Sequence, residues 1–289
     1  MVSVVIPLYN AEAFIRKTVE SVLHQTFQDF EIIVVDDGST DTGPDIAREM
    51  GKNDGRIRVV RIPNSGRPSV PRNVGISNSN GEFVAFLDQD DLWDSQKLAL
   101  QVGLLNENPA LDFVSSVAET FGNISFFSER FGIIPRKYHL RDKSYLLTSP
   151  IVCSSVVARK KVLEQFGGFD EDPRLIAVED YDLWIRILES GEGAIVPLAL
   201  VRYRFHHAGT SASREKMLVR LNYLRERKHA IVIPSKYEGD RGVLFLMARN
   251  LVHFAGMVML RIRSSLMNMT GGSIAIVTNK GNTVFLRSH

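Results

Sequence analysis

The sequence is poor in cysteine, in net charge and in long apolar runs, and each shortage excludes a class of protein. Its 289 residues include one cysteine, Cys153, so a scaffold stapled by internal disulfides is excluded and a reducing compartment fits. There are 35 lysines and arginines against 33 aspartates and glutamates, a formal net charge of +2. A dedicated nucleic-acid binder is usually strongly basic, so we expect no nucleic-acid partner.

No stretch of about 18 residues is apolar without interruption, as a transmembrane helix would require. The nearest, at 243–260, contains Arg249, Asn250 and His253. The first residues show neither a basic leader nor the apolar segment of a signal peptide, so we expect none and predict a cytoplasmic protein. Hydrophobic residues at 44% and charged residues at 24% are ordinary for a globular chain and exclude wholesale disorder.

The first 110 residues alternate short β-branched runs with amphipathic stretches. This order predicts a parallel sheet with helices on both faces, in which ligands bind outside the carboxyl ends of the strands. Polar clusters at 7–10, 36–41 and 88–91 follow three of these ends, so we expect them to meet at one rim. The expected strands are 2–6, 31–35, 57–62 and 82–87, and the expected helices are 11–26, 41–50, 69–79 and 95–106.

Beyond residue 110 the pattern is less regular. We expect three regions: a first half at 1–110, a second half at 111–212 and a C-terminal helical extension at 213–289. The later strands are expected at 112–121, 152–158 and 194–204, helices at 160–166, 179–190, 214–229 and about 242–267, a loop-rich connection at 122–150, and two short strand-like pieces within 270–289.

Asp88, Asp90 and Asp91 place three carboxylates within four residues after a buried strand. Carboxylates this close repel one another unless a cation or a hydrogen-bond donor compensates them. Mg²⁺ and Mn²⁺ favour a few carboxylates together with phosphate oxygens, so the cluster indicates a divalent-cation site. The alternative is an acidic N-terminus of the following helix, with Ser95 as a further candidate cap.

A second acidic cluster, at 36–41, contains Gly38, which permits a close backbone approach or a positive φ. A carboxylate at the rim of the sheet can accept a hydrogen bond from a nucleobase N–H or a ribose hydroxyl. The alternative is an Asx-turn and a helix cap. Either cluster alone is a weak indication of function.

Five segments in this order are more specific together than apart. They are Pro7-x-Tyr9-Asn10, Asp36-Asp37-Gly38-Ser39-Thr40-Asp41, Arg72-Asn73-x-Gly75, Gly81-Glu82-Phe83 followed by Leu87-Asp88-x-Asp90-Asp91, and Glu179-Asp180-x-Asp182 followed by Arg186. This pattern resembles the family 2 glycosyltransferases, strongly over 1–110, less so over 150–212, and not after about 215. The resemblance implies an α/β GT-A fold: a Rossmann-like, mostly parallel sheet flanked by helices, here with a C-terminal helical tail.

The resemblance implies that the half at 1–110 binds a nucleotide sugar and that the half at 111–212 binds the acceptor and carries the catalytic base. It also implies a reaction and its residues. The implied enzyme is an inverting transferase that uses a nucleotide-diphosphate sugar, most often a UDP-sugar, with a divalent cation (Mn or Mg). In the implied assignment, Pro7, Tyr9 and Asp37 hold the base, Asp88 contacts the ribose or diphosphate, Asp90 binds the metal, Asp180 of the pair Glu179-Asp180 is the catalytic base, and His206 approaches the diphosphate or metal. Arg72 and Arg67 are candidates to neutralise phosphate.

The chemistry agrees with this assignment. Departure of the diphosphate develops negative charge that a cation stabilises, and the attacking hydroxyl must lose a proton to a nearby carboxylate. The alternative for Glu179 and Asp180 is an ordinary acid-rich first turn of a helix. The resemblance favours transfer to a hydroxyl of a glycan or lipid-linked acceptor in surface polysaccharide synthesis. Two rivals stay open: a transferase that charges polyprenyl phosphate, and a non-catalytic nucleotide-sugar or glycan-binding module.

The C-terminal extension combines a basic helix after Arg214 with an amphipathic apolar helix. Such a pair can lie on an anionic leaflet, here the inner face of the plasma membrane. The alternative is packing on the catalytic domain or on a second copy in a homo-oligomer. Cys153 lies in an apolar run, so we expect it to be buried and inert.

Overall fold

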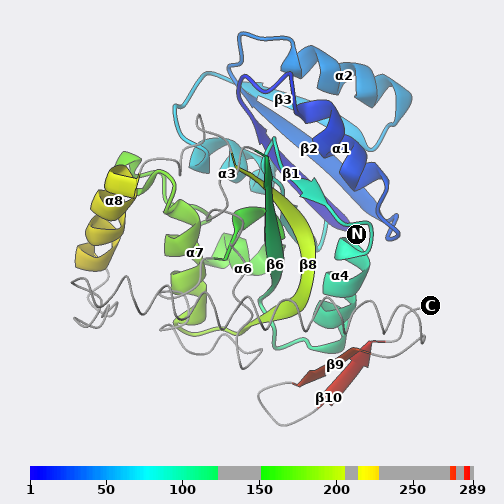
Figure 1. Ribbon diagram of the computed structural model, residues 1–289, viewed down its shortest axis with the longest axis vertical. Helices are drawn as coiled ribbons and strands as arrows, with labels where there is room; N and C mark the ends of the chain where they lie inside the picture. Colours follow the sequence, from blue (N-terminus) through cyan, green and yellow to red (C-terminus); the bar gives the residue numbers. More distant parts are fainter. Residues whose placement is uncertain (123–150, 206–213, 228–273, 278–282, 287–289) are drawn as a thin grey trace.

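The computed structural model describes residues 1–122, 151–205, 214–227, 274–277 and 283–286 (Figure 1). Its body is an eight-stranded sheet in the order β3-β2-β1-β4-β7-β6-β8-β5, with helices on both faces. Strands from both sides of the expected boundary at 110 therefore share one sheet. A separate antiparallel pair, β9 (Ile274–Val277) and β10 (Thr283–Leu286), confirms the strand-like pieces expected near the C-terminus.

The first four strands form the expected parallel unit. They are β1 (Val2–Leu8), β2 (Phe30–Asp37), β3 (Ile57–Ile62) and β4 (Phe83–Phe86), and they are joined by α1 (Ile15–Leu23), α2 (Gly43–Asn53) and α3 (Ser69–Ser77). The chain moves outward from β1 to β3 and then returns to place β4 on the other side of β1. The boundary between β1 and β4 is thus the topological switch point, where open α/β sheets bind their ligands.

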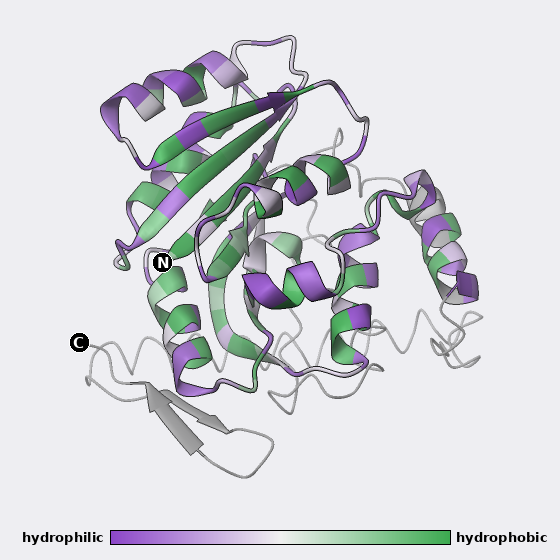
Figure 2. Ribbon diagram, turned by 180° about the vertical axis from the view of Figure 1, so that it is seen from behind, coloured by the Kyte–Doolittle hydropathy of each residue, from purple (hydrophilic) through white to green (hydrophobic). Residues whose placement is uncertain are grey.

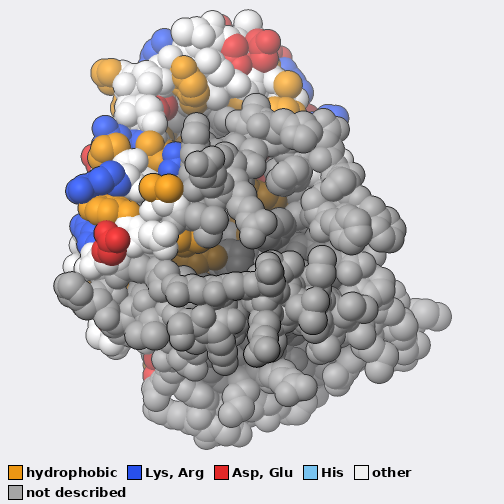
Figure 3. All heavy atoms as spheres, turned by 60° about the vertical axis from the view of Figure 1, so that its left-hand side comes forward, with side chains coloured by type: hydrophobic (Ala, Val, Ile, Leu, Met, Phe, Trp, Pro, Cys, Tyr) orange, Lys and Arg blue, Asp and Glu red, His pale blue; other side chains and the backbone are white. Residues whose placement is uncertain are grey.

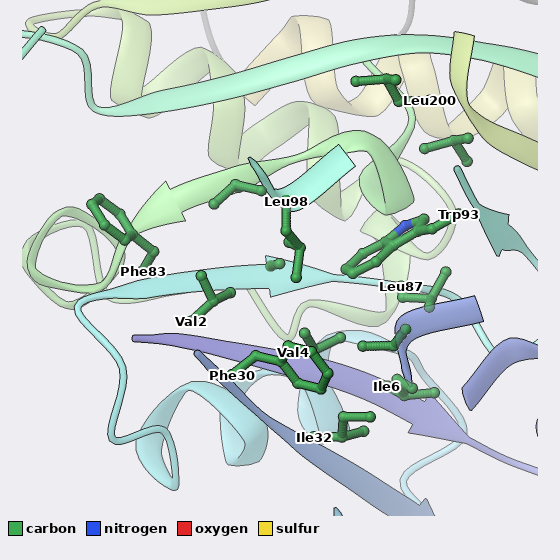
Figure 4. Packing of buried hydrophobic residues seen from close by; sticks show 14 of the residues in the cluster. Val2, Val4, Ile6, Phe30, Ile32, Phe83, Leu87, Trp93, Leu98 and Leu200 are labelled. Atoms are coloured by element: carbon green, nitrogen blue, oxygen red, sulfur yellow. The ribbon is translucent and has the colours of Figure 1, made fainter. Parts of the chain in front are cut away.

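Strand β1 is buried along its whole length because both faces of the sheet are covered. Val2, Val4 and Ile6 point into a cluster with α1, α2 and α4, shown in Figure 4. Val5 points to the opposite face and packs with α3, α6 and α7. The two-sided cover explains the uninterrupted apolar run of this strand. Figure 2 shows the same arrangement, with apolar strands inside and polar residues on the outer sides of the helices.

The second half continues the sheet with mixed pairing. β7 (Val157–Arg159) is antiparallel to β4 and to β6 (Phe113–Gly122), whereas β8 (Gly193–Phe205) is parallel to β6. The expectation of a mostly parallel sheet therefore holds for the first half, and the complete sheet is mixed. Helix α4 (Lys97–Glu107) ends the first half. The helices of the second half are α6 (Lys160–Gln165) and α7 (Glu179–Leu188), with short 3₁₀ turns at Cys153–Ser155 and Pro173–Leu175.

Two expectations about local structure were wrong. The strand expected at 152–158 begins with the turn Cys153–Ser155, so only β7 extends the sheet there. Leu92–Trp93 form β5, antiparallel to β8, and α4 starts only at Lys97. Asp94, not Ser95, accepts the N–H of Gln96 in front of this helix, at 2.9 Å. The acidic 88–91 loop is separated from the helix by a strand, so it does not cap the helix.

The first described helix of the C-terminal extension packs on the half of the chain at 111–212. Helix α8 (Arg214–Arg227) buries Leu224 in the cluster around α7, and its Tyr223 hydroxyl donates to Asp172 Oδ2 at 2.9 Å. Its Arg227 pairs with Asp170. This helix therefore uses its apolar side within the chain. The expected loop at 122–150 and the apolar helix at 242–267 lie outside the described residues.

Three smaller observations agree with the sequence. Cys153 is buried, and burial raises the pKa of its thiol well above the usual range, so it stays protonated and unreactive. No helix within the described ranges is long and apolar enough to cross a membrane. On the face shown in Figure 3, both acidic and basic side chains are present on the described surface, in keeping with the balanced charge.

Candidate active site

The three polar clusters meet at one rim, as expected, and side chains tie them together there. The backbone N–H of Tyr9 donates to Gln89 Oε1 at 2.7 Å, and Gln89 Nε2 donates to the Tyr9 carbonyl at 3.1 Å. On the other side, the N–H of Asn10 donates to Ser39 Oγ at 3.1 Å and Asn10 Oδ1 accepts the N–H of Thr40 at 2.8 Å. The loop after β1 therefore holds the two acidic loops on either side of it.

Pro7 and Tyr9 lie where the switch point opens. Pro7 pairs in register with Val35 of β2 but lies beyond the last β4 pair, Val5 with Phe86, so its missing N–H removes no bond to β4. The Tyr9 side chain is 47% exposed at the rim, unlike the buried strand before it. An exposed aromatic ring at this edge can stack on a planar base.

Asp37 is 4% exposed and already holds the next loop. Its Oδ1 accepts the N–H of Ser65 at 2.8 Å, and its Oδ2 accepts the Ser65 hydroxyl at 2.9 Å. Gly38 has φ +73°, and a Cβ there would lie 2.7 Å from the backbone nitrogen of Asn64, so the close approach expected of this glycine is confirmed. A base contact through Asp37 would use the oxygen lone pairs that Ser65 leaves.

The Asx-turn alternative for this cluster is correct for Asp41 and wrong for Asp37. Asp41 Oδ1 accepts the N–H of Gly43 at 3.0 Å, and its Oδ2 accepts the N–H of Glu12 at 2.8 Å. Thr42, which precedes α2, makes no side-chain cap. Asp36 also stays local, since its Oδ1 accepts the N–H of Ser39 at 2.8 Å. The cluster thus contains two carboxylates that bond the backbone of their own turn, Asp36 and Asp41, and one that reaches a different loop, Asp37.

In the 88–91 loop, Asp91 is the structural carboxylate. It is fully buried, accepts the N–H of Arg204 at 2.8 Å and the Ser154 hydroxyl at 2.6 Å. Burial, and then the negative charges of Asp88 and Asp90, raise the pKa of Asp91 well above its usual range. Asp88 and Asp90 are half-buried at the rim, so these two can face a ligand.

Arg72 does not have the position expected of a phosphate ligand. It is 4% exposed on α3, with NH2 2.6 Å from Asp88 Oδ1 and NH1 2.6 Å from Glu179 Oε1. Its guanidinium also lies 5.4 Å over the ring of Phe169. Arg72 therefore joins the 88–91 loop to the start of α7, and any effect on a ligand would act through these two carboxylates.

Asn73 and Gly75 fix the position of α3, the helix that carries Arg72. Asn73 Nδ2 donates to the Phe169 carbonyl at 2.8 Å, and the Phe169 N–H donates back to Asn73 Oδ1 at 2.8 Å. A Cβ on Gly168 would lie 2.5 Å from that Oδ1, and one on Gly75 would lie 2.2 Å from Val5 Cγ1. The glycines thus let α3 approach β1 on one side and the 167–169 turn on the other.

Asp180 lies in the first turn of α7, directly after the Glu179 that Arg72 holds. The three acids of this turn have different partners: Glu179 binds Arg72, and Asp182 binds Arg186 Nε at 2.7 Å. Asp180 Oδ1 accepts the N–H of Tyr181 at 2.8 Å, and within the described residues no side chain bonds this carboxyl. Asp180 thus lies in an acid-rich first turn of a helix, as the alternative expected. It differs from Glu179 and Asp182 because each of those two carboxylates bonds an arginine.

The surroundings of Asp180 suit an acid–base group. Burial, and then the negative charge of Glu179, raise the pKa of Asp180 to about 8, with Arg72 acting against them. Asp88 also raises this pKa, which shows that the 88–91 loop and Asp180 are close enough to interact. A carboxyl that titrates near neutral pH is well matched to proton transfer.

The carboxylates at the rim fit a hard cation that shares its coordination with a substrate. Within the described ranges, no three His, Cys, Asp or Glu side chains cluster as a complete metal site. Asp88 and Asp90 supply few oxygen donors, which is the donor set of a cation that also takes phosphate oxygens. His206 lies outside the described residues. Sequence reasoning missed Gln89, Ser65, Ser154 and Arg204, whose partners are distant in the chain.

Comparison with known proteins identifies the family of this chain. The family described as "Glycosyl transferase family 2" matches residues 3–167. A Bacillus subtilis protein, "Putative teichuronic acid biosynthesis glycosyltransferase TuaG", is 31% identical over 221 residues, 75% of this chain and 83% of that one. The Escherichia coli "UDP-Glc:alpha-D-GlcNAc-diphosphoundecaprenol beta-1,3-glucosyltransferase WfgD" is 29% identical over 222 residues, 76% and 83%. In a Rickettsia bellii "Uncharacterized glycosyltransferase", 30% identical over 218 residues, the match spans 30% of the length.

Solved structures show the same fold. TarS of S. aureus, residues 1–349 in complex with UDP-GlcNAc, superposes with a TM-score of 0.64 at 22% identity, covering 82% of this chain and 68% of that chain. The mannosyltransferase PcManGT from Pyrobaculum calidifontis, in complex with GDP-Man and Mn²⁺, gives 0.60 at 18% identity, covering 92% and 80%. These matches confirm the expected GT-A fold. The chain belongs to glycosyl transferase family 2.

Proposed function

We propose that this chain is an inverting, metal-dependent glycosyltransferase that moves a sugar from a UDP-sugar to a hydroxyl of a lipid-linked saccharide during surface polysaccharide synthesis. One observation carries the proposal: Arg72 bonds both Asp88 and Glu179, which brings the acidic 88–91 loop and Asp180 to the same switch point. The half-buried carboxylates of the 88–91 loop face the departing diphosphate, and Asp180 faces the incoming hydroxyl. A module that only binds a nucleotide sugar or a glycan would have no use for Asp180.

The donor is held by the loops after β1 and β2. Tyr9 supplies an exposed ring for the base, Pro7 shapes the strand end beneath it, and Asp37 accepts from the base beside Ser65. The solved structures of the same fold are described in complex with UDP, UDP-GlcNAc or GDP-Man, which supports a nucleotide-sugar donor here. We favour UDP because the family resemblance and the activity named for the Escherichia coli relative both indicate it.

Asp90, with Asp88 beside it, would hold the divalent cation. The cation supplies stabilisation of the negative charge that develops on the diphosphate. The Mn²⁺ in the PcManGT complex supports this use of the fold. The chain's own part is to keep two half-buried carboxylates facing the rim while Asp91 and Ser154 fix the loop behind them.

Asp180 accepts the proton of the attacking hydroxyl. Its Oδ1 is bonded to the Tyr181 N–H, which leaves Oδ2 for the acceptor. As the oxygen bonds to the anomeric carbon from the face opposite the diphosphate, the bond to the diphosphate breaks and the configuration inverts. Arg72 keeps the neighbouring Glu179 neutralised, so that carboxylate does not compete for the proton.

The base favours a hydroxyl acceptor over polyprenyl phosphate. A phosphate oxygen is already deprotonated at neutral pH and needs no base, whereas a sugar hydroxyl does. The Escherichia coli relative is described as acting on a GlcNAc joined by a diphosphate to undecaprenol, which supports a lipid-linked saccharide here. We accordingly place the reaction at the cytoplasmic face of the membrane, where nucleotide sugar and lipid-linked acceptor meet.

A thermal-shift panel tests the proposal. UDP, GDP, dTDP and CMP are each added with and without Mn²⁺ to wild type, to Asp90→Asn and to the control Asp94→Asn, whose carboxylate is exposed and bonds Gln96. A ligand at 100 times its dissociation constant stabilises by about 2.7 kcal/mol. We expect a Mn²⁺-dependent shift with UDP that Asp90→Asn loses and Asp94→Asn keeps. A shift with GDP alone would change the donor, and no shift with any nucleotide would contradict the enzyme.

A further inference from the structure

Arg204, near the end of β8, bonds the 88–91 loop at two points. Its backbone N–H donates to Asp91 Oδ1 at 2.8 Å, and its side-chain Nε donates to the carbonyl of Asp90 at 2.8 Å. The second bond reaches Asp90, which is half-buried at the rim. Arg204 follows Asp90 by 114 residues in the sequence, so this bond joins two distant parts of the chain.

The guanidinium of Arg204 is held in place by two aromatic rings. Its central carbon lies 4.3 Å from the ring centre of Phe121 on β6 and 4.8 Å from that of Phe14, which directly precedes α1. A planar guanidinium stacks on such rings, so its orientation is fixed and Nε keeps its direction. The two rings come from the donor side and from the second half, so both sides contribute to this contact.

The 88–91 loop is anchored on either side of Asp90. Gln89 pairs with the backbone of Tyr9, and Asp91 is bonded to Ser154 and to the Arg204 N–H. The bond from Arg204 Nε holds the Asp90 carbonyl itself. With the peptide plane fixed, the direction of the Asp90 side chain is restricted toward one position at the rim.

The neighbouring Arg202 offers a natural comparison. It lies two residues earlier on β8, and its guanidinium also lies over Phe121, at 4.6 Å. Its side chain is exposed, and among the described residues it donates no hydrogen bond to the 88–91 loop. The two arginines thus have the same charge, lie on the same strand, β8, and stack on the same ring, that of Phe121. They differ because Arg204 bonds the Asp90 carbonyl.

We propose that Arg204 is a positioning residue for Asp90: its Nε bond fixes the loop so that the Asp90 carboxylate is presented to a divalent cation. This inference rests on the proposed function, in which Asp90 binds the metal. Outer groups that orient a metal ligand typically change metal affinity 10- to 100-fold when removed, so the effect should be measurable as binding. A lysine in place of Arg204 keeps the charge and loses the planar Nε donor.

The experiment measures Mn²⁺ binding to the full chain by electron paramagnetic resonance, with and without UDP and with no turnover. Wild type is compared with Arg204→Lys, Arg204→Gln and the control Arg202→Lys, each checked by circular dichroism. We expect both Arg204 variants to bind Mn²⁺ at least about tenfold more weakly, with no rescue by lysine. Arg202→Lys should stay within about twofold of wild type, since it keeps its charge and has no bond to the loop.

Several results would overturn the proposal. Wild-type affinity in Arg204→Lys would do so, because it would reduce the effect to charge. An equal loss in Arg202→Lys would do so too, because that arginine has no bond to the loop and its loss would show that the bond to Asp90 does not set the affinity. If the Arg204 variants do not fold, Phe14→Leu decides, since it removes one ring and leaves the hydrogen bonds. We expect a two- to fivefold weaker affinity there, as one cation–π contact is worth about that factor, and no change would count against the proposal. Absence of Mn²⁺ binding by wild type would instead overturn the metal site of the proposed function.

Discussion

The donor-side half of the sheet and the half that carries Asp180 are built in different ways. In the first half, β1 to β4 are parallel, β1, β2 and β4 are almost entirely buried, and the strands run directly into the loops that form the rim. In the other half, β7 has three residues, α6 has six, and a short turn replaces part of the expected strand. The donor side is thus placed by backbone pairing.

The base-carrying half is placed by side chains that reach it from elsewhere. Arg72 bonds Glu179, Asn73 pairs with the backbone of Phe169, and Arg186 donates to the Gly168 carbonyl at 2.7 Å. A single substitution can remove such a bond but cannot remove a strand ladder. We therefore expect the base-carrying half to be the more sensitive to point mutation, and four predictions test this difference.

The largest effect is expected for Asp180→Asn. The asparagine keeps the shape but cannot accept the proton, and a general base contributes about 10²- to 10⁴-fold, so kcat should fall by that factor. Donor affinity should be unchanged. Single-turnover rates and calorimetric donor titration measure the two quantities. Asp182→Asn is the control, because Asp182 bonds Arg186 and should affect stability more than rate. Full activity in Asp180→Asn would remove this residue from the reaction.

The next effect concerns the buried link through Arg72. Arg72→Met leaves Asp88 and Glu179 without their cation, and breaking a buried pair costs about 3–5 kcal/mol, measured by urea denaturation. Adding Glu179→Gln should recover part of the loss because one uncompensated charge disappears. Arg174→Met is the control: Arg174 is 66% exposed beside Asp172, and little change is expected. Equal losses in both single variants would mean that the Arg72 link has no special weight.

The pH dependence follows from the pKa of about 8 that burial and Glu179 give Asp180. Asp180 accepts a proton only when ionised, so kcat/KM should rise about tenfold per pH unit and level off above about pH 8. Stability should change in the opposite direction. In the unfolded chain the carboxyl of Asp180 has a pKa of about 3.9. Between about pH 4 and 8 the folded form therefore holds a proton that the unfolded form has lost.

This contribution of Asp180 to stability therefore falls as the pH rises through that window. Asp180→Asn removes the fall, so its Tm should exceed that of wild type at pH 8 and approach it at pH 4. Rate profiles and thermal melts over this range measure both trends. A flat rate profile from pH 6 to 9, or identical melts at pH 8, would contradict the assignment.

The smallest effect compares two helical glycines. A Cβ at Gly75 would lie 2.2 Å from Val5 Cγ1, so Gly75→Ala should cost about 1–3 kcal/mol by overpacking. A Cβ at Gly103, inside α4, meets nothing within 4 Å, so Gly103→Ala should gain about 0.5–1 kcal/mol. Urea denaturation measures both. Equal effects would show that α3 does not need its close approach to β1.

The sequence predicted the donor side well because its signals are local. The strand at 57–62 has the expected bounds, and the three polar clusters meet at the rim because parallel strand ends share an edge. β5 was missed because it has two residues and exists only by pairing Leu92 with Arg202. The sequence could not show that Arg72 bonds Glu179 instead of lying open to a phosphate, because the two residues are 107 positions apart.

The paired bonds between Asn73 and Phe169 have a consequence for the order of folding. The two residues are 96 positions apart, so the bonds form only after a long loop has closed. Loop closure becomes more costly with length, although only by about 0.6 kcal/mol for each doubling, and distant contacts slow folding. The pairs of β1 with β2 and of β2 with β3 close much shorter loops, since Val2 pairs with Phe30 and Ile32 with Ile57. We therefore expect these three strands to form first and to serve as the template on which the chain around Asp180 later assembles.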